Sequence, residues 1–213
     1  MPTRGRRELV RYAVECFHSQ TYQNRELVIL DDADDPSFPD GLVHPAVRYF
    51  REPERFTIPI KRNHVNALAR GEVLIHFDSD DWSDPTRMAQ QVARLEETGK
   101  AVTGYQTLFF YDPETGQSFE YRSKSNYALG TSLCYYKWWW EASKFNEGRP
   151  VGSDNYFVYA ADRAKQLDPI PGGRMIVARI HADNTSKGKG HGPQFVPVKE
   201  LPAGFLASME VTA

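Results

Sequence analysis

The stretch 72–82, EVLIHFDSDDW, decides the fold. Its apolar first half is typical of a buried strand, and the strand runs directly into Asp78, Asp80 and Asp81. Carboxylates this close repel one another unless a cation, a basic side chain or a bound proton offsets their charge. The pattern has two interpretations: a solvated turn that caps a helix over 84–98, or a divalent-metal site at the end of a strand, where open α/β sheets bind ligands.

Helix and strand patterns alternate around this stretch. Apolar spacing predicts helices over 6–19, 59–69 and 84–98, and short apolar runs predict strands over 26–30, 47–50 and 72–77. Such alternation is typical of βα units around a mainly parallel sheet. The strand over 26–30 also ends in acids, Asp31 and Asp32, so we expect two strands to bring carboxylates to one edge of the sheet.

The second half of the chain has a more antiparallel pattern. It predicts a hairpin of strands over 101–110 and 117–122, further strands over 132–136 and 174–180, and helices over 138–145 and 154–162. A chain of 213 residues can bury a substantial core as one domain. We therefore expect a single domain with halves over 1–100 and 101–196, followed by a tail over 197–213 with no predicted element.

Composition limits the possible partners and the compartment. The 26 basic and 28 acidic residues are interspersed, so no basic surface for nucleic acid is predicted. Cys16 and Cys134 lie far apart and lack metal-ligand spacing, which suits a reducing cytoplasm and a metal bound through oxygen. No apolar run approaches the ~18 residues of a spanning helix, and no signal peptide is recognised, so we expect a cytoplasmic protein without a transmembrane segment.

Four segments, taken together in this order and spacing, resemble the family 2 glycosyltransferases of the GT-A fold. They are PTRGRRE (2–8), QTYQNRELVILDD (20–32), IPIKRNHVNALARGEVLIHFDSDD (58–81) and VGSDNYF (151–157). The resemblance covers roughly residues 1–186. It implies a nucleotide-diphospho-sugar transferase fold, with a mixed, mainly parallel sheet flanked by helices. It also implies that the first half of the domain binds the nucleotide sugar and the second half binds the acceptor.

The activity implied by this resemblance is metal-dependent sugar transfer of the hexosyltransferase type. The donor is a nucleoside diphosphate sugar, and the acceptor is a hydroxyl of a saccharide, a lipid or a small molecule, with inversion at the sugar carbon. A Mg²⁺ or Mn²⁺ ion that bridges the phosphates would stabilise the charge of the leaving diphosphate. By resemblance, Asp78 and Asp80 form the DxD pair, with Asp80 the metal ligand and Asp81 a possible substitute. His181 lies in a segment that can supply a histidine to the metal.

The resemblance also implies contacts to the nucleotide. Asp31 and Asp32 would hydrogen-bond the base and the ribose, because carboxylates suit ring N–H and hydroxyl donors. Thr3 would line the same pocket, Asp78 would contact the nucleotide as well as the metal, and Arg62 would bind phosphate or base oxygens through its guanidinium group. The alternative interpretation of Arg62 is a surface ion pair worth under ~1 kcal/mol.

Asp154 resembles the catalytic base of the family. An inverting transferase needs a carboxylate that takes the proton of the attacking hydroxyl. Asp154 also follows Ser153 at the start of a predicted helix, where a carboxylate stabilises the helix, and the two roles can coexist. Ser153 stands where the family often carries an acid. His181 has the alternative interpretation of a structural hydrogen-bonding residue.

The largest departure from the family pattern lies at Met1 and Pro2. In the GT-A fold a central strand precedes the proline–threonine loop, and here that first strand is missing from the sequence. An unfilled gap would leave two strands with unpaired backbone groups. We expect the gap to be filled by the C-terminal tail or by another subunit, which would make a homo-oligomer, or else to lower solubility and activity.

Three other functions are alternatives to the transferase. A catalytically silent sugar-nucleotide or carbohydrate-binding domain of GT-A type is the main alternative, because of the missing strand and Ser153. A nucleotidyltransferase would carry a Gly-rich basic loop near its start, where only Gly5 stands. A phosphatase of the DxDx(T/V) type is disfavoured because Trp82 occupies the Thr or Val position.

Overall fold

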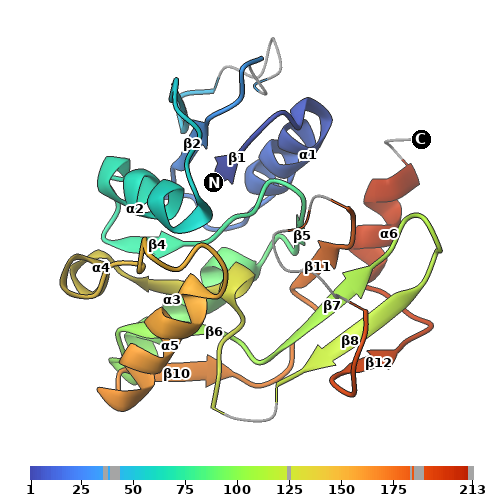
Figure 1. The fold of residues 1–213 in the computed structure, drawn as a ribbon. Helices are drawn as coiled ribbons and strands as arrows, with labels where there is room; N and C mark the ends of the chain where they lie inside the picture. The colour runs from blue at the N-terminus through green and yellow to red at the C-terminus, as the bar shows by residue number, and fades with distance from the viewer. Residues whose placement is uncertain (36–37, 39–43, 124–125, 183, 185–189, 211–213) are drawn as a thin grey trace.

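The computed structural model describes residues 1–35, 38, 44–123, 126–182, 184 and 190–210. Short strands form three sheets with helices around them (Figure 1). The strands are β1 (Pro2–Thr3), β2 (Leu27–Asp31), β3 (Val47–Arg51), β4 (Val73–Ile75), β5 (Trp82–Ser83), β6 (Val102–Tyr105), β7 (Thr107–Tyr111), β8 (Ser118–Arg122), β9 (Cys134–Tyr136), β10 (Leu167–Ile170), β11 (Ile176–Arg179) and β12 (Phe195–Pro197). The helices are α1 (Arg7–His18), α2 (Ile58–Leu68), α3 (Arg87–Thr98), the 3₁₀ turn η1 (Gly130–Ser132), α4 (Lys137–Ala142), α5 (Ser153–Arg163) and α6 (Ala203–Glu210).

The second and third sheets each combine strands from both predicted halves of the chain. β1, β2 and β3 pair in parallel. The second sheet has the order β10-β6-β9-β4 and mixes parallel and antiparallel pairs. The third has the order β12-β8-β7-β11-β5 and is mainly antiparallel. The prediction of an α/β domain with mixed pairing and flanking helices is confirmed.

Amphipathic spacing accounts for the helices next to the site. On α1, Val10, Ala13 and Phe17 recur at helical intervals and are buried in the core. α3 ends at Gly99, whose φ of +63° is a left-handed conformation that glycine adopts without strain. α3 begins at Arg87, three residues later than predicted, because Asp84 accepts hydrogen bonds from the Thr86 backbone N–H and hydroxyl in the preceding turn.

The predicted strand over 101–110 is in fact two strands in two sheets. β6 pairs with β10 and β9, whereas β7 pairs with β8 and β11, so the chain changes sheet at Gln106. A continuous run of strand-type residues contains no signal for such a change, because both strands are buried on both faces. β10, in the segment 167–170, was not predicted.

The C-terminal tail is ordered over its described part, although the sequence predicts no element there. β12 adds to β8, and α6 packs Phe205 against Trp82 and Tyr111. Tyr12 on α1 also hydrogen-bonds Ser208. The described tail thus covers the α1 side of the third sheet, far from α2 in Figure 1, and the expectation that it fills the gap beside β1 is wrong for these residues. Residues 211–213 lie outside the described residues. Among the described helices, none is both long and apolar enough to cross a membrane.

A cavity of about 610 Å³ separates the first two sheets. Its walls include β2 and β4, and its lining is partly apolar, with Val28, Val65 and Leu74 among the residues. Within the described chain, β4 pairs only with β9, and on this side β2 pairs only with the two residues of β1. Two sheet edges therefore face the cavity with backbone groups that no strand pairs.

Filling this cavity is expected to stabilise the domain. We predict that an apolar strand of about six residues, fused ahead of Met1, raises the melting temperature and the soluble yield, because it pairs both edges and buries apolar surface. For a domain of this size, each kcal/mol gained raises Tm by ~2–4 °C. Differential scanning calorimetry measures the shift, and a Gly/Ser extension of equal length is the control. Equal Tm and equal activity in the two proteins would contradict the prediction.

Candidate active site

The loop after β4 brings its carboxylates into a cleft of about 140 Å³. The cleft also receives side chains from the loop after β1, from α2 and from the start of α5. Its polar lining comprises Arg6, Arg62, Asp78, Ser79, Asp80, Asp81, Ser153, Asp154 and Asn184. The structure therefore unites the predicted metal residues with the predicted base, although more than 70 residues separate Asp80 from Asp154 in the sequence.

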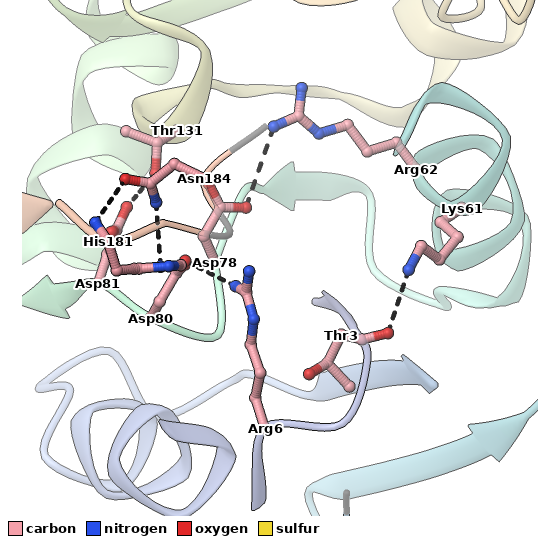
Figure 2. A network of polar contacts seen from close by, with 10 residues as sticks. All are labelled: Thr3, Arg6, Lys61, Arg62, Asp78, Asp80, Asp81, Thr131, His181 and Asn184. Carbon is pink, nitrogen blue, oxygen red and sulfur yellow. Dashed lines mark hydrogen bonds and ion pairs between the residues drawn. The ribbon is translucent and has the colours of Figure 1, made fainter. Parts of the chain in front are cut away.

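Asp80 lies at the centre of a polar network (Figure 2). One of its oxygens, Oδ2, accepts a hydrogen bond from Arg6 Nη1 at 2.7 Å and lies 2.8 Å from His181 Nε2. Asn184 Nδ2 lies 3.0 Å from the same imidazole nitrogen, and the His181 backbone N–H donates to Asn184 Oδ1. His181 therefore contacts the acidic loop directly, as the metal-site prediction requires. Arg6, which was not predicted, offsets the charge of Asp80 in this structure.

Asp81 and Asp78 have different partners. Thr131 Oγ1 donates a 2.6 Å hydrogen bond to Asp81 Oδ2, and Arg62 Nη2 lies 4.0 Å from Asp78 Oδ1. Figure 2 shows both contacts, Thr131 with Asp81 and Arg62 with Asp78. The three carboxylates of the loop are thus held apart from one another, each by its own basic or hydroxyl partner.

The donor set fits a divalent ion that is completed by phosphate oxygens. Asp80 Oδ2 and His181 Nε2 are close enough to share one ion, and Mg²⁺ commonly takes one or two carboxylates together with substrate phosphates. Within the described residues, no group of three or more His, Cys, Asp or Glu side chains is arranged to hold a metal ion by itself. The remaining ligands would therefore come from the substrate and from water.

Arg62 is buried, with 9% of its surface exposed, so its interpretation as a surface ion pair is wrong. Its guanidinium lies over the ring of Phe145 at 5.7 Å, and among the described residues its Nε has no hydrogen-bond partner. A buried charge with incomplete pairing is costly unless another group satisfies it. The guanidinium lines the cleft, where an anionic ligand would satisfy it.

The predicted nucleotide residues at the end of β2 are buried, and their carboxylates accept hydrogen bonds from other side chains of the domain. Tyr49 donates to Asp31 Oδ2 at 2.7 Å, and Lys61 Nζ donates to Asp32 Oδ1 at 2.7 Å. Lys61 also donates to the Thr3 carbonyl at 3.1 Å, as Figure 2 shows, which ties α2 to β1. Burial lowers the pKa of Lys61, and Asp32 opposes that effect. Lys61 was missed because nothing in its sequence neighbourhood distinguishes it from a surface lysine.

Asp154 lies in the first turn of α5, where its charge also favours the helix. Gly152 precedes the helix with a φ of +73°, a left-handed conformation that suits glycine. Within the described chain, no group donates a hydrogen bond to the Asp154 carboxylate, and this carboxylate lines the cleft. It is therefore available to accept a proton from a bound hydroxyl.

Comparison with known proteins gives consistent matches. The sequence profile described as glycosyl transferase family 2 matches residues 1–161. The chain is similar to the glycosyltransferase EpsH of Bacillus subtilis (strain 168), with 26% identity over 132 residues, 55% of this chain and 37% of that protein. It is also similar to EpsE of the same organism, with 30% identity over 95 residues, 40% of this chain and 33% of that protein. The chain thus spans about a third of the length of these relatives.

Solved structures share the fold at low identity. S. aureus TarS, residues 1–349 in complex with UDP-GlcNAc, has a TM-score of 0.66 at 14% identity, covering 88% of this chain and 59% of that chain. The mannosyltransferase PcManGT of Pyrobaculum calidifontis, in complex with GDP-Man and Mn²⁺, has a TM-score of 0.61 at 16% identity, covering 84% of this chain and 55% of that chain. These likenesses confirm the predicted fold class.

Proposed function

Because the chain belongs to glycosyl transferase family 2 and has its GT-A fold, we propose that it transfers a sugar from a nucleoside diphosphate sugar to an acceptor hydroxyl, with a divalent metal and with inversion. One observation carries this proposal: a single cleft is lined by Asp80, whose carboxylate lies 2.8 Å from His181 Nε2, and by the Asp154 carboxylate, to which no described residue donates a hydrogen bond. The solved neighbours with UDP-GlcNAc and GDP-Man support a nucleotide-sugar donor.

In this mechanism the donor half of the domain, residues 1–100, binds the diphosphate. Asp80 and His181 would hold Mg²⁺ or Mn²⁺, and the ion would stabilise the charge that develops on the leaving diphosphate. Arg62 offers the diphosphate a buried guanidinium, and Arg6 can move from Asp80 to a phosphate oxygen when the ion binds. Thr3, Asp31 and Asp32, which are buried, would contact the base and the ribose.

The acceptor half, residues 101–196, supplies the base. Asp154 accepts the proton of the acceptor hydroxyl as its oxygen attacks the anomeric carbon, and the diphosphate leaves with the bonding electrons. The sugar carbon is attacked on the face opposite the leaving group, so its configuration inverts. We further propose a cytoplasmic location, which the buried free thiols of Cys16 and Cys134 favour.

Donor binding is expected to depend on Asp80. A nucleoside diphosphate at 100 times its Kd stabilises by ~2.7 kcal/mol, which raises Tm by ~5–11 °C. We predict such a shift with UDP or GDP in the presence of Mn²⁺ or Mg²⁺, and a much smaller one in EDTA or in Asp80→Asn. Asp84→Asn is the matched control and should behave as the wild type, because Asp84 follows β5 and its carboxylate accepts hydrogen bonds from Thr86. No shift with any diphosphate would refute the proposed donor.

A catalytically silent binding domain is the second candidate function. The observation that favours it is the cavity between β2 and β4 in the donor half, where no strand of the described chain pairs with the facing sheet edges. An assay of turnover distinguishes the two candidate functions. Metal-dependent transfer or hydrolysis of a nucleoside diphosphate sugar supports the enzyme, whereas binding without turnover on a panel of donors supports the silent domain.

A further inference from the structure

The turn η1 lies between the acidic loop and the start of α5. Two of its residues contact carboxylates of the cleft: Gly130 lies against Asp154, and the Thr131 hydroxyl donates a hydrogen bond to Asp81. Neither residue belongs to any of the segments on which the family resemblance rests. The contacts therefore point to a role for η1 that the proposed mechanism does not yet contain.

Gly130 is the surface against which the Asp154 carboxylate rests. A methyl group built on Gly130 would lie 1.9 Å from Asp154 Oδ2, 2.7 Å from Cγ and 2.9 Å from Cβ. Real Cβ atoms do not approach other atoms so closely, so only glycine permits this position of the carboxylate. Because Asp154 Cβ is also within 3.0 Å, rotation of the carboxylate alone does not relieve the overlap. Any side chain at position 130 must therefore displace Asp154.

Thr131 restrains the other side of the cleft. Its hydroxyl donates a 2.6 Å hydrogen bond to Asp81 Oδ2, and Asp81 is nearly buried. A hydroxyl donor to a carboxylate is a strong, directional contact. It keeps Asp81 turned toward η1, and so separates its charge from that of Asp80, which Arg6 and His181 contact.

The turn itself is held by a buried polar framework. Arg87, fully buried on α3, donates to the carbonyls of His76 and Thr131, and Gln91 donates to the Ser132 carbonyl at 2.6 Å. His76 Nδ1 lies 2.7 Å from the Gly130 carbonyl, which can only accept, so this nitrogen carries the proton. Burial lowers the pKa of His76.

We propose that η1 is a positioning element that sets the distance between the two halves of the site, with Gly130 placing Asp154 and Thr131 placing Asp81. Neither residue needs to touch the substrate. The catalytic consequence rests on the proposed function, whereas the placement itself does not. A rigid support of this kind matters because displacement of a reacting group by ~1 Å can lower a rate about 10²-fold.

Carbon-13 NMR of the aspartate carboxyl groups tests the placement without any turnover. The resonances of Asp154 and Asp81 are assigned from Asp154→Asn and Asp81→Asn. We expect Gly130→Ala to shift the Asp154 resonance and leave that of Asp81 in place, and Thr131→Val to do the reverse. Thr131→Ser, which keeps the hydroxyl, should restore the wild-type spectrum. Gly148→Ala is the matched control, because its methyl would meet only the Asn146 side-chain oxygen at 3.3 Å.

Kinetics then tests the consequence. Gly130→Ala should lower kcat about 10²-fold with little change in the KM of the donor. Unchanged carboxyl resonances in Gly130→Ala and Thr131→Val would overturn the inference. If the Asp154 resonance shifts in Gly130→Ala but the wild type turns over no donor, the placement stands and the proposed function is refuted. If Gly130→Ala fails to fold, Gly130→Ala combined with Asp154→Gly decides, because glycine at 154 removes the three atoms that the new methyl would overlap. Recovered folding in the double variant supports the contact, and persistent unfolding contradicts it.

Discussion

Asp154→Asn is expected to lower kcat by about 10²–10⁴-fold, the usual contribution of a general base. Asparagine keeps the size of the side chain and its place on Gly130 but cannot take a proton from a hydroxyl. Because Asp154 lies on the acceptor half of the cleft, the Kd of the nucleoside diphosphate should stay within about twofold of the wild-type value. Initial rates of sugar transfer, with isothermal titration calorimetry of the diphosphate, measure both quantities.

The matched control for this prediction lies on the same helix. Asp162, near the other end of α5, accepts a hydrogen bond from Asn126 and is exposed, so Asp162→Asn should retain the wild-type kcat. The first-turn carboxylate of Asp154 also stabilises α5 by ~0.3–1 kcal/mol, so a small fall in Tm is expected as well. Equal kcat in Asp154→Asn and the wild type would remove Asp154 from the mechanism.

The carboxylate residues were predictable because each follows an apolar strand. Asp78 and Asp80 follow β4, and Asp31 ends β2. The end of a strand is visible in the sequence as a change from apolar to acidic residues. The expectation that these two strands share one sheet edge is wrong, because β2 and β4 belong to different sheets. The fold class follows from the same alternation of helix and strand patterns.

The groups that hold those carboxylates were not predictable from local pattern. Arg6 reaches Asp80 across 74 positions, and Lys61 reaches Asp32 across 29. A basic residue on a helix or in a loop is by default a solvated surface charge, and only the tertiary fold shows which ones are buried. Gly130 was missed for a related reason, because a close approach between distant segments leaves no periodic trace in the sequence.

Lys61→Met is expected to lower the free energy of unfolding strongly. The side chains of Lys61 and Asp32 are 6% and 0% exposed, and their atoms Nζ and Oδ1 are 2.7 Å apart. Methionine preserves the volume of the lysine stem but leaves the Asp32 carboxylate buried with only the Phe56 backbone N–H as a described donor. Removing one partner of a buried pair typically costs ~3–5 kcal/mol, which for a domain of this size lowers Tm by ~6–20 °C.

The companion variants separate the loss of the ion pair from a general loss of charge. Lys100→Met removes a lysine whose Nζ, among the described residues, donates only to the Lys165 carbonyl, and it should change Tm by no more than a few degrees. Combining Lys61→Met with Asp32→Leu should recover much of the loss, because an apolar pair carries no buried charge to satisfy. A double variant as unstable as the sum of the two single variants would contradict the ion-pair account. In that case the Lys61 contact to the Thr3 carbonyl, which joins α2 to β1, would carry the stabilisation instead.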